Sequence, residues 1–491
     1  MDLWEVCFAL PFVLPTNVFQ VFAFTSLLFN DRKDSADHPN VERRATQTAN
    51  IQLDLQHAIG HTGSMFVGVT MDTSFFKGRW SDVNLNSNAL HTLARALSPC
   101  YLRIGGTAAD TLIFNAPAQG DNFTLTECIV LTQFGHWDLI FDLNVMLRHD
   151  NDKWDPTNAR QLLRYSDDHG YNIACFQLGN EPNFMQHKFH RPLSGSRLAQ
   201  DYQILKSVLH EFPRYQNSCI LGPEVTKLTV PATRQYLEDF LESGGNHVVS
   251  AVSLHHYYYS FNSHGVRMEY LTNSTVLDLL KDELNIANAV SHRLAPGVPI
   301  WFTETNSASG ADPDYATQYV AGFIWMDKLG LSAQHGIKHV IRHSFFYRLV
   351  TRTLKPNPDY FLTLLHKKLI QGPVLKVHGS SETVRVYAHC SHPSSYPAGA
   401  VTVMALNIQN QAATLTLPQF RGQQMDVYLL TAGDQNGLTS EFIALNGEKL
   451  EMVNDQLPPL APKRQTGDVH MPAYSFAFVV IPTASAHVCK T

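Results

Sequence analysis

The sequence predicts an α/β protein, a (β/α)8 TIM barrel with an appended antiparallel β-sandwich domain. Between about residues 65 and 370, short apolar runs alternate with amphipathic stretches, which is the pattern of a β/α fold. After residue 370 the runs alternate polar and apolar residues between Gly, Pro and Asn, which is typical of antiparallel strands. With 491 residues and 44% hydrophobic content, the chain has room for both domains.

Eight of the apolar runs are candidate barrel strands, because eight parallel strands that alternate with helices close into a barrel. They are residues 65–72, 101–106, 137–144, 174–179, 219–224, 249–257, 300–304 and 339–345. Amphipathic stretches at 88–97, 198–212, 276–294 and 319–329 predict helices between them.

The expected parts of the chain are a leader over 1–48, a strand segment over 49–64, the barrel over 65–370 and the sandwich over 371–491. The early run Ile51-Gln-Leu-Asp-Leu alternates polar and apolar residues, so we expect it to pair with the C-terminal sheet.

The leader has the composition of a secretory signal. Residues 3–29 are rich in Phe, Leu and Val, but Asp2 and Glu5 lie where positive charge is expected, and Pro11 and Pro15 interrupt the run. We interpret the segment as an imperfect signal peptide, with a partial or mispredicted N-terminus as the alternative, and we expect no stable membrane insertion. The sequons at Asn122 and Asn273 are candidate glycosylation sites. Together these features predict a secreted or lysosomal glycoprotein.

Charge and cysteine usage exclude several classes of partner. The chain has 37 Lys+Arg against 43 Asp+Glu, a net charge of −6, so no global basic field would attract nucleic acid. A polyanion would have to bind in a local cleft. The seven cysteines form no CxxC pair, which argues against a zinc site, and we expect neither metal nor cofactor. The sequence leaves the oligomeric state open.

Two glutamates end apolar runs where a barrel carries its active site, at the C-terminal ends of the strands. The fourth run ends in Asn180-Glu181-Pro, and the seventh ends at Glu304. Retaining glycoside hydrolysis needs two carboxylates about 5–5.5 Å apart, one as nucleophile and one as acid/base. We therefore expect Glu304 to be the nucleophile and Glu181 the general acid/base, whose pKa burial beside Glu304 would raise. Asn180 is placed to bind the 2-hydroxyl of the sugar.

Three further residues are candidates to support this pair. The sixth run ends in His-His-Tyr-Tyr-Tyr, and its inward-facing members His255 and Tyr257 would orient the nucleophile. Arg103 lies inside the second run, where a buried arginine needs a carboxylate partner such as Glu304 or Glu181.

Several longer motifs resemble the heparanase family. They are Ser98-Pro-Cys-Tyr-Leu-Arg-Ile-Gly-Gly-Thr, Gln177-Leu-Gly-Asn-Glu-Pro-Asn, His255-His-Tyr-Tyr, Glu304-Thr-Asn-Ser-Ala, Ala321-Gly-Phe-Ile-Trp-Met-Asp-Lys-Leu-Gly-Leu-Ser and Asn357-Pro-Asp-Tyr-Phe-Leu. The resemblance covers residues 50 to 491. It implies a (β/α)8 barrel with a β-sandwich, retaining chemistry without a metal, and cleavage of heparan sulfate at glucuronate.

The resemblance also assigns substrate contacts. It places Asp72, Thr107 and Tyr257 in the sugar subsites, and Tyr347 and Gly310 on the loops that follow the eighth and seventh strands. Both loops depart from the family pattern, since the segment before Tyr347 is shorter and the one at Gly310 lacks the family's tyrosine and glycine run. In the family these loops help to bind the carboxylate of the uronate, so we expect this contact to differ most in the present chain.

The resemblance implies a disulfide between Cys390 and Cys489. Basic residues that would contact sulfate groups are Lys227, Arg234 and Arg267, with Arg191 and Arg197 as further candidates.

Two other functions remain open. A leech-type endo-β-glucuronidase that acts on hyaluronan would share the fold and both carboxylates, and the low basicity of the chain favours an unsulfated polymer. A noncatalytic glycosaminoglycan-binding homologue would lack an intact nucleophile motif, whereas Glu304 is present here.

The vertebrate enzymes of the family carry a long segment after the second strand that is excised on activation. In this chain the stretch between Phe114 and Trp137 is short enough to be an ordinary connection. We therefore expect activity as one uncut chain, highest at acidic pH.

Overall fold

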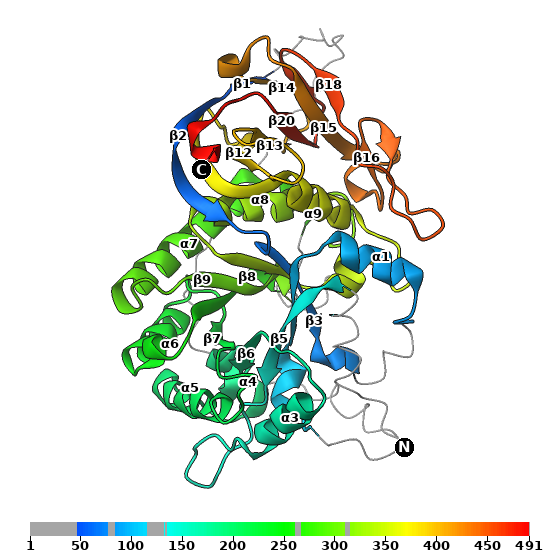
Figure 1. The fold of residues 1–491 in the computed structure, drawn as a ribbon. Helices are drawn as coiled ribbons and strands as arrows, with labels where there is room; N and C mark the ends of the chain where they lie inside the picture. The colour runs from blue at the N-terminus through cyan, green and yellow to red at the C-terminus, as the bar shows by residue number, and fades with distance from the viewer. Residues whose placement is uncertain are drawn as a thin grey trace, which may run out of the picture. The chain divides into compact units, whose positions relative to one another are not determined.

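The computed structural model describes residues 47–76, 84–114, 132, 135–260, 267–309 and 315–490. Within them a closed barrel of parallel strands is joined to an antiparallel β-domain, so the fold class predicted from the sequence is confirmed (Figure 1). The expected leader lies outside the described residues except for Gln47 and Thr48, which belong to the first strand. Among the described helices, none is long and apolar enough to cross a membrane.

The barrel closes in the strand order β10-β3-β4-β5-β6-β7-β8-β9. Its strands are β3 (Val67–Asp72), β4 (Cys100–Gly105), β5 (Trp137–Leu143), β6 (Cys175–Leu178), β7 (Cys219–Val225), β8 (Ala251–Ser260), β9 (Ile300–Ser309) and β10 (His339–Arg342). All eight predicted strands are present.

Strand β9 differs most from the prediction, because it continues to Ser309 instead of ending at Glu304. Its pairing with β8 runs on to Tyr259 and Ala308, past the point where the apolar run stops. Residues 305–308 are buried although most of them are polar. The apolar pattern therefore predicts a strand that is shorter than the one in the structure. Glu304 consequently projects from the middle of a paired strand rather than from its end.

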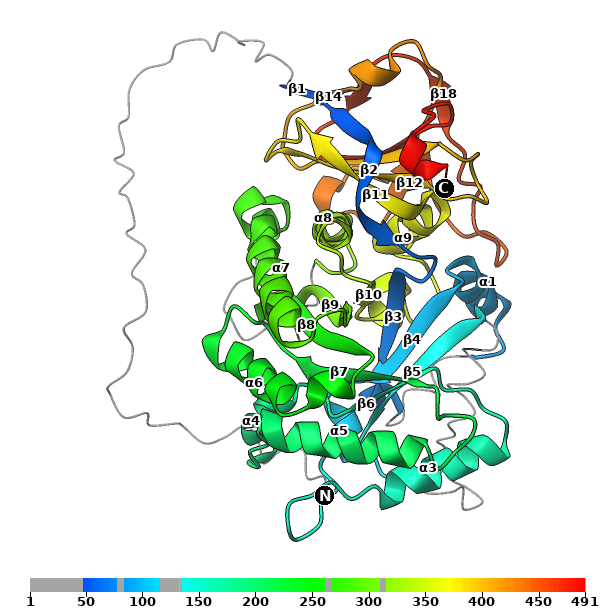
Figure 2. The same cartoon turned by 60° about the vertical axis from the view of Figure 1, so that its left-hand side comes forward.

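The helices of the described barrel surround the strands (Figure 2). They are α1 (Asn88–Ala96), α3 (Thr157–Asp168), α4 (Met185–Phe189), α5 (Gly195–Leu209), α6 (Pro231–Glu242), α7 (Ser274–Leu294), α8 (Ala321–Gln334) and α9 (Pro358–Leu369). Helix α1 shows why they form, since Leu90, Leu93 and Ala94 recur at helical spacing and are fully buried. Helix α8 is buried on all sides, because it contacts both β9 and the strands of the β-domain.

The β-domain consists of a large antiparallel sheet and a three-stranded sheet, β1-β14-β19. The large sheet has the order β17-β16-β15-β20-β13-β12-β11-β2, with β18 paired to β15. The strands are β1 (Gln47–Asn50), β2 (Gln52–Thr62), β11 (Ile370–His378), β12 (Val384–Ser391), β13 (Val401–Asn407), β14 (Ala413–Thr416), β15 (Met425–Ala432), β16 (Ile443–Leu445), β17 (Glu448–Lys449), β18 (Lys463–Gln465), β19 (Val469–Met471) and β20 (Ser475–Ile481). Strand β2, which contains most of the early alternating run, pairs antiparallel with β11.

Two disulfides are present in the described residues. Cys390 of β12 is joined to Cys489, with their Cα atoms 5.3 Å apart, inside the range that a disulfide requires. A second bond joins Cys175 of β6 to Cys219 of β7, which are direct partners in the parallel register. The sequence did not predict this second pair, because only the strand register brings the two residues together.

Candidate active site

A cavity of about 710 Å³ opens at the C-terminal ends of the barrel strands. Glu181 and Glu304 both line it, as the sequence predicted. One carboxylate oxygen of Glu181 and one of Glu304 lie within 4.8 Å of each other. Such a close approach is typical of a retaining pair, whose carboxyl groups lie about 5–5.5 Å apart, whereas an inverting pair lies about 6.5–9.5 Å apart to leave room for a water molecule.

Glu304 has a donor on each of its carboxylate oxygens. The Tyr257 hydroxyl donates to Oε1 at 2.6 Å, and Arg103 Nη1 donates to Oε2 at 2.7 Å. Burial acts to raise the pKa of Glu304, but the charges of His255, His343 and Arg103 and the Tyr257 hydrogen bond bring it far below its ordinary value. The group is therefore ionised and fixed in orientation, as a nucleophile requires.

Arg103 links several buried side chains beneath the cavity through its hydrogen bonds. Besides Glu304 it donates to Gln177 at 2.7 Å, to Asn180 Oδ1 at 2.9 Å and to Glu224 at 3.1 Å. Gly105, two residues on in β4, is required here, because a Cβ at that position would lie 2.6 Å from the Arg103 guanidinium carbon. The sequence predicted that either Glu304 or Glu181 would pair with Arg103, and in the structure the partner is Glu304.

The contact with Arg103 also orients Asn180. A guanidinium can only donate, so the side-chain oxygen of Asn180 faces Arg103 and its amide nitrogen is left for the cavity, which Asn180 lines. An N–H donor at this position suits the sugar 2-hydroxyl that the sequence assigned to this residue.

Glu181 has a left-handed backbone, with φ of 48°, where β6 turns into the short helix that begins at Pro182. Its carboxylate lies 3.1 Å from Lys188 Nζ and 3.3 Å from His255 Nδ1. Burial acts to raise the pKa of Glu181, but the hydrogen bond and charge of His255 and the charge of Lys188 outweigh it and lower that pKa. The predicted rise is therefore wrong for the site without substrate, because Glu304 acts upward less strongly than the two cations act downward.

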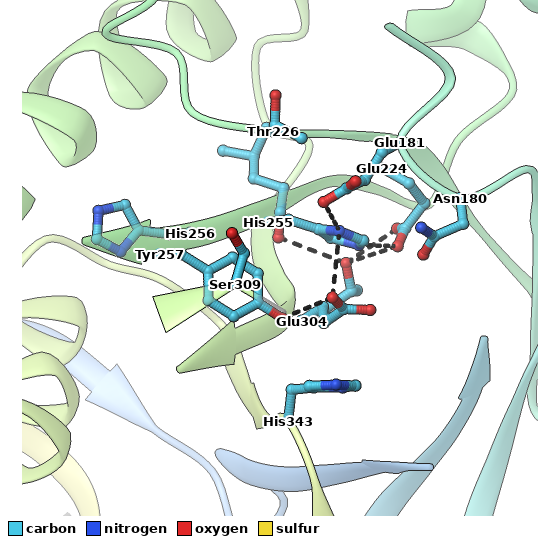
Figure 3. Close-up of polar contacts among 12 residues, drawn as sticks. Asn180, Glu181, Glu224, Thr226, His255, His256, Tyr257, Glu304, Ser309 and His343 are labelled. Carbon is cyan, nitrogen blue, oxygen red and sulfur yellow. Dashed lines mark hydrogen bonds and ion pairs between the residues drawn. The ribbon is translucent and has the colours of Figure 1, made fainter. Parts of the chain in front are cut away.

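His255 lies between three carboxylates (Figure 3). Its Nε2 is 2.7 Å from Glu224 Oε2, and its Nδ1 is 3.3 Å from Glu181 and 3.9 Å from Glu304. Burial acts to lower the pKa of His255, but the carboxylates raise it to about 9. The sequence predicted that His255 orients Glu304, whereas its hydrogen bonds go to Glu181 and to Glu224.

Glu224 is a buried carboxylate in contact with Arg103 and His255 that the sequence reasoning did not single out. It ends the fifth predicted strand, so the rule that found Glu181 and Glu304 applied to it as well. It is fully buried and does not line the cavity, and only the structure reveals that it faces inward.

Glu181, His255 and Glu304 together offer three atoms of the kind that bind metals. In this structure Arg103 and Lys188 already supply positive charge to the two carboxylates. The arrangement therefore balances its charges with protein cations, in keeping with acid/base and nucleophilic roles.

Most of the other substrate contacts expected from the resemblance reach the cavity. Asp72 at the end of β3, Thr107 after β4 and Tyr347 after β10 all line it, along with Tyr257. Gly310 lies outside the described residues.

The candidate sulfate contacts Lys227, Arg234 and Arg267 do not line this cavity, and contact with sulfate groups outside it stays a prediction. Lys227 donates to the Tyr258 carbonyl, Arg234 lies on the outer face between α6 and α7, and Arg267 pairs with Glu269. Their sequence positions beside the strand ends gave no information on side-chain direction.

The further candidates, Arg191 and Arg197, form ion pairs with Asp152 and Asp201. Neither arginine lines the cavity.

The basic side chains that do line the cavity belong to different residues. His343 follows β10, and Arg348 and Arg352 lie on the loop beyond it. The Arg352 guanidinium stacks 4.9 Å from the centre of the Tyr347 ring. A basic loop after the eighth strand was readable in the sequence, but its orientation toward the cavity was not.

Residues 122–330 match the family model described as glycosyl hydrolase family 79, N-terminal domain. The chain is 33% identical to heparanase of Gallus gallus, over 90% of this chain and 97% of that protein. It is 31% identical to hyaluronoglucuronidase of Hirudo nipponia, over 90% of this chain and 99% of that protein. It is also 30% identical to inactive heparanase-2 of Homo sapiens, over 90% of this chain and 89% of that protein.

Among solved structures, the fold is similar to a 4-O-α-L-rhamnosyl-β-D-glucuronidase from Fusarium oxysporum. The TM-score is 0.64 at 17% identity, covering 88% of this chain and 99% of that chain. Because the match covers most of both chains, the similarity in fold includes both the barrel and the β-domain.

Proposed function

Because this chain belongs to the heparanase family of glycoside hydrolases, we propose that it is a retaining endo-β-glucuronidase that cleaves heparan sulfate. The observation that carries the proposal is the pair of carboxylates, Glu181 and Glu304, within 4.8 Å of each other in the cavity. The family relationship supplies the substrate class, and the site supplies the stereochemistry.

In the first step Glu304 attacks the anomeric carbon of the glucuronate while Glu181 protonates the glycosidic oxygen. The bond to the leaving sugar breaks, and the glucuronate becomes an ester of Glu304. Asn180 donates to the 2-hydroxyl as positive charge develops on the ring. Arg103 and Tyr257 keep the attacking carboxylate ionised and aligned.

In the second step Glu181, now a carboxylate, removes a proton from water as the water attacks the same carbon. The ester bond breaks, and Glu304 regains its charge between Arg103 and Tyr257. Two displacements at one carbon retain its configuration. NMR of the first-formed products tests this, since an α-configured product would contradict the retaining mechanism.

The cations of the cavity favour a sulfated substrate. Arg348 and Arg352 line the same cavity as the two glutamates, and arginine binds sulfate and carboxylate groups in a bidentate manner. Replacing both by Gln should lower kcat/KM on heparan sulfate by roughly tenfold or more, since a hydrogen bond to a charged group contributes about 1.5–3 kcal/mol. Hyaluronan cleavage, if present, should change less. Arg234→Gln, on the outer face of α6, is the matched control.

A hyaluronan-cleaving endo-β-glucuronidase is the second candidate. The 31% identity to the leech hyaluronoglucuronidase favours it, as does the net charge of −6. Product analysis on heparan sulfate, hyaluronan and chondroitin in parallel separates the two candidates. Cleavage of hyaluronan with heparan sulfate left intact would replace the first proposal by the second.

A noncatalytic role is the third candidate, since one relative is an inactive heparanase. Against it stand the intact pair and the donors that hold Glu304. Binding of all three polymers without any products would support it.

We further propose that the enzyme is secreted or lysosomal and acts as one uncut chain. The two disulfides support passage through an oxidising compartment. The exposed Asn273 of the second sequon remains a candidate glycosylation site, whereas Asn122 lies outside the described residues. The short connection between Phe114 and Trp137, most of which is also outside them, supports activity without excision. Protein that is inert until nicked there would contradict this.

A further inference from the structure

Glu224 is a third carboxylate in the floor of the site, and neither step of the proposed mechanism uses it. It is fully buried, and each of its oxygens has partners. The hydroxyl of Thr303 donates to it at 2.9 Å, Arg103 Nη2 at 3.1 Å and His255 Nε2 at 2.7 Å. Burial acts to raise the pKa of Glu224, but Arg103 and His255 outweigh it and lower that pKa. Glu224 is therefore a fixed negative charge.

A fixed carboxylate on Nε2 decides which nitrogen of His255 can exchange a proton. An ionised carboxylate only accepts hydrogen bonds, so Nε2 must carry a hydrogen whether the ring is charged or neutral. Nδ1 is then the only ring nitrogen with a variable proton. It lies 3.3 Å from Glu181 Oε1, a gap that a small rotation of either side chain closes.

We propose that Glu224 is a positioning residue that makes His255 the proton partner of the acid/base Glu181, so that the two side chains share one proton between Nδ1 and Oε1. This inference rests on the proposed glycosidase function. It gives His255 and Glu224 a role beside Glu181 that charge balance alone does not require, because Arg103 already pairs with Glu304.

The shared proton reconciles the surroundings of Glu181 with its role as an acid. On Nδ1, the proton makes an imidazolium–carboxylate pair, and on Oε1 it makes a carboxylic acid beside a neutral imidazole. The transfer moves one proton, and the electron pair of the N–H bond stays on Nδ1. When a sugar displaces water from the cavity, the neutral arrangement is favoured, because loss of solvent penalises both charges. Glu181 thus becomes an acid without taking a proton from solvent.

The pH at which the pair loses its shared proton depends on the charges around it. Negative groups that face it are Glu224 and Glu304 from β7 and β9. The other charged or titratable groups nearby are Arg103 on β4, Asp142 on β5, Lys188 on α4, Tyr257 on β8 and His343 beyond β10. Removing a negative charge makes the pair release its proton at lower pH, whichever atom holds the proton.

The test is the pH profile of kcat/KM for Glu224→Gln, measured on the polymer that the wild type cleaves. The alkaline limb of the wild-type profile should lie above about pH 4.3, the ordinary pKa of a glutamate. In Glu224→Gln it should move to lower pH by roughly one unit or more. KM should change little, since Glu224 does not line the cavity.

Two variants control for loss of packing. Glu224→Asp keeps the charge, so its alkaline limb should stay near that of the wild type even if kcat falls. Glu283→Gln makes the same chemical change at a buried carboxylate on α7 that accepts the backbone N–H groups of Leu228 and Thr229. It should leave the limb in place. An unmoved limb in Glu224→Gln, or an upward shift, would overturn the proposal, as would an equal shift in Glu224→Asp.

Nitrogen-15 NMR of the wild-type His255 ring keeps the proposal testable if Glu224→Gln does not fold. The signal should titrate at Nδ1 while Nε2 stays protonated, and a neutral ring protonated on Nδ1 would refute the inference. This readout needs no turnover. A wild type that cleaves no glycosaminoglycan would refute the proposed function, while the tautomer would still decide the role of Glu224.

Discussion

Replacing Tyr257 by Phe removes one of the two donors that hold the nucleophile. In the structure its hydroxyl donates to Glu304 Oε1 at 2.6 Å. Burial, with the charge of Glu304 adding to it, raises the pKa of Tyr257 well above its ordinary value, so the hydroxyl stays protonated. A hydrogen bond to a charged group contributes about 1.5–3 kcal/mol, which corresponds to roughly 10-fold to 150-fold in rate.

The loss should fall mainly on the second step, because Glu304 regains its negative charge there and needs the donor most. In the first step the same hydrogen bond also stabilises the attacking carboxylate, so its removal has a smaller effect. The Tyr257→Phe enzyme should therefore show a lower kcat, a lower KM and a covalent glycosyl ester on Glu304 that accumulates during turnover.

Rapid-quench kinetics on a defined heparan sulfate oligosaccharide, with mass spectrometry of the peptide that contains Glu304, measures all three quantities. Thermal unfolding of the variant provides the control for folding. A kcat within about twofold of the wild type would refute the assigned energy of the hydrogen bond. A large fall in kcat with a raised KM and no ester would show that Tyr257 acts on the first step instead.

Three further predictions follow from the same site and from the β-domain. Glu181→Gln and Glu304→Gln should each abolish turnover while folding and polymer binding persist, so near wild-type activity in either would sink the assignment. Activity should persist well into acid, where the lowered pKa of Glu304 keeps the nucleophile ionised, and should fall only on the alkaline side, as the Glu181–His255 pair loses its shared proton. A rate that rises steadily from about pH 5 to pH 8 would contradict this order. Replacing Cys390 and Cys489 by Ala should lower the free energy of unfolding by roughly 4 kcal/mol in the chain-entropy model, measured by denaturant unfolding, and no change would argue against the bond.

Much of the fold was readable from the chain. The barrel strands appear as short apolar runs because both faces of a parallel strand are buried. Strand β9 shows the limit of this rule, since its polar residues beyond Glu304 are buried by pairing with β8 and give no apolar signal.

The two carboxylates that line the cavity could be identified from the sequence for a related reason. A barrel carries its chemistry at the C-terminal ends of its strands, so Glu181 and Glu304 could be picked out by position alone. The same rule applied to Glu224 at the end of β7, but position does not say whether a buried carboxylate faces substrate or supports its neighbours. Hydrogen bonds to Arg103 and His255 settle that, and they join residues distant in sequence.

The fold class and the positions of the two cavity carboxylates follow from local periodicity and strand order, and the disulfide of the β-domain follows from the family resemblance. The lowering of the pKa of Glu181 and the identity of the basic residues that reach the cavity could be seen only in the folded structure. Both depend on distances of a few ångströms between side chains on different strands. Electrostatic interactions change steeply over such distances in a buried site, and sequence position does not encode them.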